Sequence, residues 1–253
     1  MTDDPALLDA ARSGDRKALE RLLVLEEPRI YAYGLRMCGD PEDAREVLQE
    51  TMLAVTRHIG GFRGDAKLST WLFQLARSAC SKQRRRLPPT SDGEVELVDH
   101  NADPERTASA QQLAELLQRA LSRLTETQRE VLILRDVEGL SAPEVSEILH
   151  LEVGAVKSRL HRARAALAEA LDAEQRVPRL KLTGCPDILV NWSEREEGDI
   201  DHAVCEKLEA HVATCPACRA RCDQLTATRA ACRELPPVPA AAHEAARSAR
   251  ETR

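Results

Sequence analysis

The sequence predicts an all-α protein with room for two or three small domains. Aromatic residues make up only 2% of the 253 residues, so leucine, valine, isoleucine and alanine must fill the cores, a composition that suits helices. Apolar residues also recur at helical spacing along most of the chain. Helix-start signals, such as Asp4 before Pro5 and Asp40 before Pro41, precede several of these segments.

The N-terminal third is expected to hold four helical segments. One pattern begins at Pro5, and Pro28 is expected to open a second helix that ends at the breaker residues 39–41. The next helix has an apolar face with one residue on each successive turn: Ala44, Leu48, Met52 and Val55. A glycine-rich loop at 60–65 leads into a helix that begins at about Leu68 and ends in a basic cluster.

Breaker residues and changes in composition divide the rest of the chain. Proline pairs, Asp-Gly and Asp-Pro steps mark linkers, and a proline- and alanine-rich end indicates a disordered or loosely helical tail. The expected parts are a helical domain at 1–86, a linker at 87–110, a second helical domain at 111–171, a linker at 172–184, a cysteine-rich domain at 185–232 and a tail at 233–253.

The charge distribution is more informative than the net charge of −6. The segments 77–86 and 155–166 contain several lysines and arginines and no acid, whereas acids collect at 92–105 and 187–209. Two basic patches on an acidic chain favour two faces that contact phosphates, and solvated helix faces are the alternative.

No apolar run approaches the length of about 18 residues that spans a bilayer. The N-terminus is acidic and lacks the basic start and apolar stretch of a signal peptide. We therefore expect a cytoplasmic protein without a membrane partner.

The segment 139–166 predicts a helix-turn-helix. Ser141 is placed to cap a short helix, and a tight turn leads to a second helix with apolar residues on its inner side. Polar residues near the start of such a helix reach base edges in the major groove, and later arginines reach phosphates. A plain helical hairpin is the alternative, but the basic outer face favours DNA. That face carries Lys157, Ser158, His161 and Arg162.

The stretches REVLILRDVEGLS and VGAVKSRLHRARAAL resemble region 4 of extracytoplasmic-function (ECF) sigma factors. The resemblance implies that the second helix reads the −35 promoter element through these four outward residues. Ala155 stands where this family usually has threonine, which puts one hydroxyl contact at the helix start in doubt.

The N-terminal domain is similar to region 2 of the same family. DAREVLQE resembles the helix that docks on the clamp of the polymerase β′ subunit, which implies polymerase contacts from Glu46, Gln49 and Glu50. FRGDAKLSTWLFQLARS resembles the loop and helix that capture and melt the −10 element, and Ser78 stands where the family usually has asparagine.

Aromatic side chains beside a basic groove suit the capture of an unstacked base. Phe62 and Phe73 are the candidates for the base pocket, and Trp71 is expected to be a core anchor.

Six of the eight cysteines lie between 185 and 232, and in a reducing compartment such clustering favours metal binding or redox chemistry. Cys38 and Cys80 lie singly in helical patterns and are expected to be small core residues. His211, Cys215 and Cys218 have the spacing of a tetrahedral zinc site.

The cysteine-rich segment resembles the zinc-binding anti-sigma fold, in which a leading cysteine completes the ligand set. The resemblance implies that the leading cysteine is Cys185. Further soft ligands suit a sensor for copper, cadmium or zinc, as in metal-responsive, CorE-like sigma factors with a fused domain. A thiol redox switch and a static zinc fold stay open. The possible additional ligands are Cys205, Cys222, Cys232 and His202.

These patterns predict a sigma factor, not an enzyme, with core RNA polymerase and promoter DNA as partners and no need for a separate anti-sigma factor. A regulator with a lone helix-turn-helix would lack the region 2 motif. A zinc enzyme would need a carboxylate for acid–base work near the metal, and no such motif accompanies these ligands.

Overall fold

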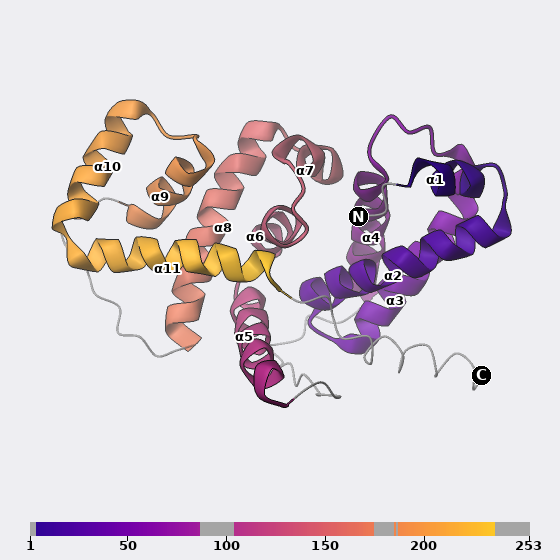
Figure 1. Ribbon diagram of the computed structural model, residues 1–253, viewed down its shortest axis with the longest axis horizontal. Helices are drawn as coiled ribbons and strands as arrows, with labels where there is room; N and C mark the ends of the chain where they lie inside the picture. Colours follow the sequence, from indigo (N-terminus) through magenta and orange to yellow (C-terminus); the bar gives the residue numbers. More distant parts are fainter. Residues whose placement is uncertain (1–3, 87–103, 175–184, 186, 236–253) are drawn as a thin grey trace. The chain divides into compact units, whose positions relative to one another are not determined.

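The computed structural model describes residues 4–86, 104–174, 185 and 187–235, and all regular structure within them is helical (Figure 1). The all-α prediction is confirmed. The chain divides into two compact units: Met1–Thr107 with Glu147–His150 and Pro236–Arg253, and Ala108–Ser146 with Leu151–Leu235. None of the described helices is long and apolar enough to cross a membrane.

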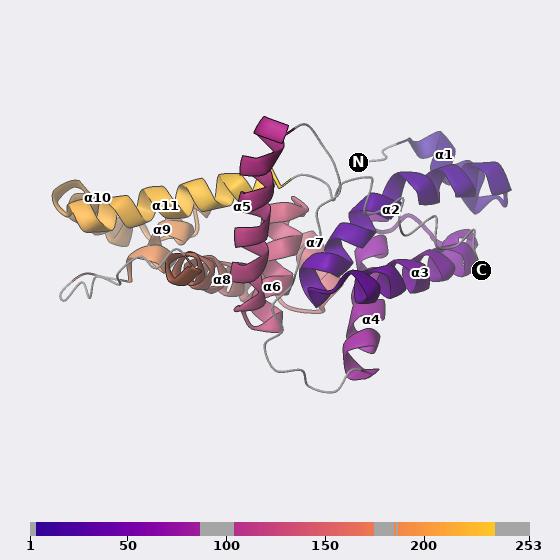
Figure 2. The same ribbon diagram turned by 90° about the horizontal axis from the view of Figure 1, so that it is seen from below.

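The first unit is built from four helices: α1 (Pro5–Arg12), α2 (Arg16–Cys38), α3 (Pro41–His58) and α4 (Leu68–Arg86). Aspartates begin the first three, because the carboxylates of Asp4, Asp15 and Asp40 each accept hydrogen bonds from two backbone amides of the first turn. Helices α2, α3 and α4 pack on one another, as Figures 1 and 2 show from two directions.

The prediction that Pro28 opens a helix is wrong, because Pro28 lies inside α2. Proline removes one amide donor, which leaves the carbonyl of Val24 without its helical partner. Val24 is exposed, so water can hydrogen-bond to this carbonyl and the helix continues. The predicted break at residues 39–41 is confirmed: Gly39 ends α2 with φ of 80°, a conformation that side chains with a Cβ rarely adopt.

The second unit contains the predicted helix-turn-helix and the cysteine-rich segment. The elements that lie wholly or mostly within it are α5 (Pro104–Ser122), α6 (Glu126–Leu132), a π-helical turn η2 (Ile133–Val137), α7 (Ala142–Leu149), α8 (Val153–Glu174), α9 (Ile188–Glu197), α10 (His202–Thr214) and α11 (Pro216–Arg233). Ser141 caps α7 as predicted, since its backbone amide donates to Glu144 at 2.7 Å and its hydroxyl accepts from the Glu144 amide at 3.4 Å.

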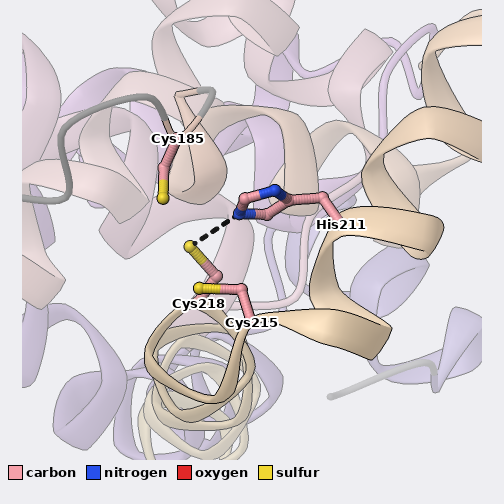
Figure 3. A group of neighbouring side chains, drawn as sticks. All are labelled: Cys185, His211, Cys215 and Cys218. Atoms are coloured by element: carbon pink, nitrogen blue, oxygen red, sulfur yellow. Dashed lines mark hydrogen bonds between the residues drawn. The ribbon is translucent and has the colours of Figure 1, made fainter.

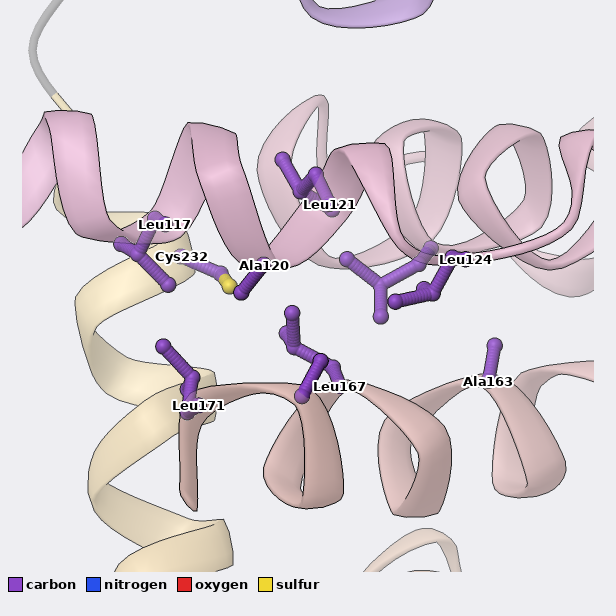
Figure 4. Packing of buried hydrophobic residues seen from close by; sticks show 10 residues of the cluster. Leu117, Ala120, Leu121, Leu124, Ala163, Leu167, Leu171 and Cys232 are labelled. Carbon is purple, nitrogen blue, oxygen red and sulfur yellow. The ribbon is translucent and has the colours of Figure 1, made fainter. Parts of the chain in front are cut away.

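The cysteine-rich segment packs against the helix-turn-helix. Helix α8 contacts both α9 and α11. Cys232 at the end of α11 is buried among leucines and alanines of α5 and α8 (Figure 4). A second apolar cluster joins Ala168 of α8 to Ile188, Leu208 and Leu225 of the cysteine-rich segment. Burial of apolar surface therefore holds the two parts together, in addition to the polar contacts described below.

Parts of the predicted linkers and tail, residues 87–103, 175–184 and 236–253, lie outside the described residues. Helices α5 and α8 extend into the described parts of the predicted linkers. Helix α5 begins at Pro104, within the segment predicted as a linker, and proline is favoured at a first helical position because its missing amide has no partner there anyway. Helix α8 continues to Glu174.

Candidate metal centre and DNA-reading helix

Cys185, His211, Cys215 and Cys218 come together in the structure, and one ligand atom from each lies within 4.8 Å of the others. We refer to these four residues as the Cys/His cluster. Figure 3 shows their side chains directed toward one another, with the His211 Nε2 atom 3.2 Å from the Cys218 sulfur. Three thiols and one imidazole are a typical donor set for tetrahedral zinc and suit other soft ions. The residues therefore fit a metal ion.

Local structure explains how the cluster forms. Cys185 precedes α9, His211 lies in the last turn of α10, and Cys215 stands between α10 and α11. Cys215 is also the N-cap of α11, where amides point toward it. Hydrogen bonding from the Cys218 backbone lowers the pKa of the Cys215 thiol, whereas burial raises the pKa of Cys218 to about 12. A bound cation would favour the thiolate form of both.

The possible additional ligands are not part of the cluster. Cys222 and Cys232 are buried in the two apolar clusters of the second unit, and Cys205 lies 3.9 Å from a Glu209 oxygen. His202 is exposed, with Glu206 one turn away. The interpretation of the surplus cysteines as metal ligands is not supported by their placement, because two of them fill core positions.

The outer face of α8 is only partly open. Ser158 and Arg162 are exposed, but the Lys157 ammonium donates to Asp199 just after α9. His161 is only 2% exposed, which corrects the expectation that it faces solvent. Its Nδ1 lies 2.9 Å from the Ser193 hydroxyl and its Nε2 lies 3.3 Å from Asp199.

The tautomer of His161 follows from these partners. The Asp199 carboxylate accepts hydrogen bonds, so Nε2 carries the hydrogen, and Nδ1 accepts from the Ser193 hydroxyl. Burial lowers the pKa of His161, the hydrogen bond with Asp199 opposes this effect, and the Arg164 charge adds to it. The imidazole is therefore neutral at neutral pH.

Arg164, one turn further along α8, is the largest fully buried side chain among the described residues and was not predicted as a site residue. Its guanidinium donates to Asp136 of the π-helical turn, with 2.7 Å between Nε and Oδ2. It also donates to Ser193 at 3.1 Å and to Glu197 at 2.9 Å. A buried charge of this kind requires such partners, because leaving one unpaired costs several kcal/mol, about 3–5.

Glu197, at the end of α9, accepts from three arginines. Arg135 donates to it at 2.8 Å, Arg164 at 2.9 Å and Arg229 of α11 at 2.6 Å. Although burial acts in the opposite direction, Arg164 and the other two arginines hold the pKa of Glu197 below its usual value. Gly198 then ends the helix with φ of 73°, which turns the chain so that Asp199 reaches α8. We call the interactions of Ser193, Glu197 and Asp199 with α8 and η2 the docking contact.

The aromatic residues of the first unit are placed differently from the prediction. Phe73 is completely buried, 5.3 Å from the ring of Tyr33, so it is a core residue and lines no open base pocket. Phe62 is also buried, 5.1 Å from the ring of Trp71. Trp71 is less buried than Phe62. The expectation that Trp71 is the core anchor and that the two phenylalanines line a base pocket is therefore reversed, because α4 turns Phe73 inward toward α2.

The other predicted contacts of the first unit lie on the surface. Glu46 and Gln49 are exposed on α3, and Ser78 is exposed on α4. Glu50 is half-buried and accepts from the Lys82 ammonium at 2.9 Å, which links α3 to the basic end of α4.

Comparison with known proteins accounts for three segments of the chain. Residues 23–87 match the Sigma-70 region 2 family, residues 114–167 match Sigma-70, region 4, and residues 185–219 match the family described as a putative zinc-finger. The RNA polymerase sigma-H factor of Pseudomonas aeruginosa is 31% identical over 181 residues, which cover 66% of this chain and 93% of that protein. The ECF RNA polymerase sigma factor SigM of Mycobacterium tuberculosis is 36% identical over 168 residues, covering 66% and 84%.

Two solved structures are similar. One is CnrH in complex with the cytosolic domain of CnrY, with a TM-score of 0.51 and 27% identity over 67% of this chain and 97% of that chain. The other is the sigma factor RpoE with the anti-sigma factor NepR from Bartonella quintana, with a TM-score of 0.50 and 22% identity over 64% and 99%, which shows the fold alone. Both are complexes with a second protein, so the comparisons do not support the expectation that no separate anti-sigma factor is needed.

The order of the two sigma regions, the helix-turn-helix geometry and these relatives agree with one another. The chain belongs to the ECF sigma factors of RNA polymerase, which are transcription initiation factors and not enzymes.

Proposed function

We propose that this ECF sigma factor is regulated by a soft metal ion, copper, cadmium or zinc, bound at the Cys/His cluster, and that the regulated step is the release of α8 from the docking contact. The observation that carries the proposal is the engagement of Lys157 and His161 by Asp199. Promoter DNA would need the same face of the helix. The docked conformation is therefore the one that cannot read the −35 element.

The DNA and polymerase contacts are assigned as follows. Ser158 and Arg162 remain available on α8 in the docked conformation, whereas Lys157 and His161 become available only on release. Ser78 and the basic end of α4 face the −10 element, and Glu46, Gln49 and Glu50 of α3 bind the polymerase clamp.

The positions of the metal ligands support a physical link between the ion and α8. The cluster joins the segment before α9, the end of α10 and the start of α11. Helix α9 carries Ser193 and Glu197, and α11 carries Arg229, which contacts Glu197. A change of ion or of coordination geometry would move these helices relative to each other, because coordination free energy supports the fold of small metal domains.

Metal sensing does not require the surplus cysteines. Cys222 and Cys232 are core residues, so the docking contact and the Cys/His cluster alone would couple the metal ion to α8. The fused segment would then act in cis in the role of an anti-sigma factor, which would make a second protein unnecessary. A purely structural zinc site and a thiol redox switch at the same cluster are the competing functions.

Reconstituted transcription tests the proposal. Core RNA polymerase and the full-length chain are assayed on a cognate promoter while zinc, cadmium or copper is titrated at constant reductant. Transcription by the wild type should change with one of these metals. Cys215→Ser should abolish that change without abolishing polymerase binding, and Cys205→Ser, which alters a thiol outside the cluster, should keep it.

Two outcomes would contradict the proposal. If Cys215→Ser and Cys218→Ser keep the wild-type metal response, the cluster is not the sensor. If the wild type shows no metal response while the protein still contains one zinc per chain, the site is structural.

A further inference from the structure

Two cysteines of the first unit have no part in the proposed function. Cys38 is the last residue of α2, and Cys80 lies in α4, 42 residues further along the chain. Their sulfur atoms are 3.2 Å apart and are not joined in a disulfide. Their positions in the sequence predict two separate core residues, because nothing in their spacing links them.

The helices hold the two thiols in this arrangement. Cys80 is completely buried on the face of α4 that packs on α2. Cys38 is fixed by the end of its helix, where the Gly39 amide donates to the Leu35 carbonyl at 2.8 Å and α3 begins at Pro41. Sulfur atoms in a disulfide lie about 2.05 Å apart, so bond formation requires the two atoms to approach by only about 1.2 Å.

We propose that Cys38 and Cys80 are a redox modification site that forms a reversible disulfide when a hydroperoxide oxidises the protein. The Cys38 thiolate attacks the peroxide oxygen, which breaks the O–O bond and leaves a sulfenic acid and, from hydrogen peroxide, water. The Cys80 sulfur then attacks the Cys38 sulfur, and the hydroxyl group leaves as a second water with the Cys80 proton. Two thiols and one hydrogen peroxide thus give one disulfide and two waters. A dithiol reductant returns both electrons.

The burial of the two residues sets the order of these steps. Cys38 is half-buried and accessible to a small oxidant, whereas Cys80 is enclosed and can only resolve the sulfenic acid from within. Contact with Cys80 and burial raise the pKa of Cys38, and the charge of Arg84 opposes them. The Cys38 thiolate is therefore scarce, so we expect its oxidation to be slow.

The disulfide would close a loop that contains all of α3 and the segment that leads to Phe62. A closed loop of this length restricts the unfolded chain and stabilises the folded one. It would join the end of α2 to α4 and would close a loop around α3, the helix proposed to bind the polymerase. This modification is independent of the Cys/His cluster and does not rest on the metal proposal.

Mass spectrometry of the full-length protein tests the pair directly. After treatment with hydrogen peroxide, the wild type and Cys205→Ala should yield a peptide pair joined through Cys38 and Cys80, with two hydrogens lost. Dithiothreitol should reverse it. The thermal midpoint of the oxidised wild type should exceed that of the reduced protein, on the order of 10 °C.

Cys38→Ala serves as the matched variant. Oxidation should not raise the thermal midpoint of this variant, because it cannot form the disulfide. Its metal-site cysteines are intact, so any effect of oxidation at the cluster would remain visible. The proposal is overturned if Cys38 is oxidised to a sulfinic acid, or stays reduced, while no linked peptide appears. It is also overturned if oxidation raises the midpoint of Cys38→Ala as much as that of the wild type.

Discussion

Helices α4 and α8 both carry a basic face that the sequence assigns to promoter DNA, but they differ in what the faces contact. On α4, Ser78 is exposed and Lys82 pairs with Glu50 of the neighbouring helix at the surface. On α8, by contrast, Lys157 and His161 are engaged by Asp199 from the cysteine-rich segment. If α8 reads the −35 element as proposed, this conformation covers part of that contact, whereas Ser78 on the α4 face stays exposed.

Electrostatics explains why the acidic part of the cysteine-rich segment binds the basic face of α8. Acids of the segment 187–209 offer carboxylates to cations that phosphates would otherwise contact, and one of them, Glu197, pairs with the buried Arg164. Surface pairs such as Lys82 with Glu50 contribute little by comparison, about 0–1 kcal/mol. A basic patch in a sequence therefore identifies a DNA face without revealing whether that face is free.

The largest expected effect concerns the interior of α4. Phe73→Ala should lower the free energy of unfolding by about 3–5 kcal/mol, because a fully buried ring beside Tyr33 leaves a cavity. Chemical denaturation measures this loss. Trp71→Ala, at a less buried position, should cost less stability and should impair strand opening more, as seen by permanganate footprinting. A stable Phe73→Ala protein that binds the promoter but fails to open it would return Phe73 to a base-contacting role.

The docking contact should respond strongly to the loss of one charge. Glu197→Gln removes the carboxylate shared by three arginines, so docking should weaken by about 2 kcal/mol and the chain should bind a −35 duplex roughly thirty-fold more tightly. Fluorescence anisotropy with labelled duplex measures the change.

Glu206→Gln is the control for this substitution, because Glu206 is an exposed glutamate of α10 whose partner is His202. It should leave the affinity unchanged. Equal affinities of Glu197→Gln and the wild type would mean that docking does not limit access to α8.

Substitutions on α8 should distinguish its exposed residue Arg162 from Lys157, which Asp199 engages, through smaller changes in −35 affinity. Arg162→Ala should weaken −35 binding by about 1–3 kcal/mol, since Arg162 is exposed and available in either conformation. Lys157→Ala should show a smaller net loss in the same anisotropy assay, because it removes a DNA contact and also loosens docking through Asp199. Unchanged binding by Arg162→Ala would exclude this helix from the interface.

The features that were predictable are local ones. His211, Cys215 and Cys218 lie within one helix end and one turn, so their spacing reveals them, and the break at Gly39 follows from backbone conformation. Arg164 could not be identified this way, because its partners lie 28–33 residues away on other elements. The inward turn of Phe73 likewise depends on the packing of α2 against α4, which the sequence pattern does not specify.

The smallest expected effect is a pH dependence of docking through His161. The groups that face its ring are Ser193, Glu194 and Asp199 on the α9 side and Arg164 on α8. Burial lowers the pKa of His161 in the docked state, Asp199 opposes this and Arg164 adds to it. The released imidazole keeps its ordinary pKa of about 6.5 and binds the proton more readily. The contribution of His161 to the stability of the docking contact is therefore fully present above the pKa of the released imidazole and is lost as the pH falls below it.

Hydrogen exchange of the α9 amides, corrected for intrinsic rates, measures this dependence between pH 8 and pH 5.5. Exchange of α9 should rise at the acidic end in the wild type and in His202→Gln, which alters an exposed histidine. His161→Gln keeps a hydrogen-bonding side chain that does not titrate, so its profile should be flat. A profile in His161→Gln that still follows the wild type would mean that a group other than His161 carries the dependence. It would then leave His161 as a neutral packing residue between Ser193 and Asp199.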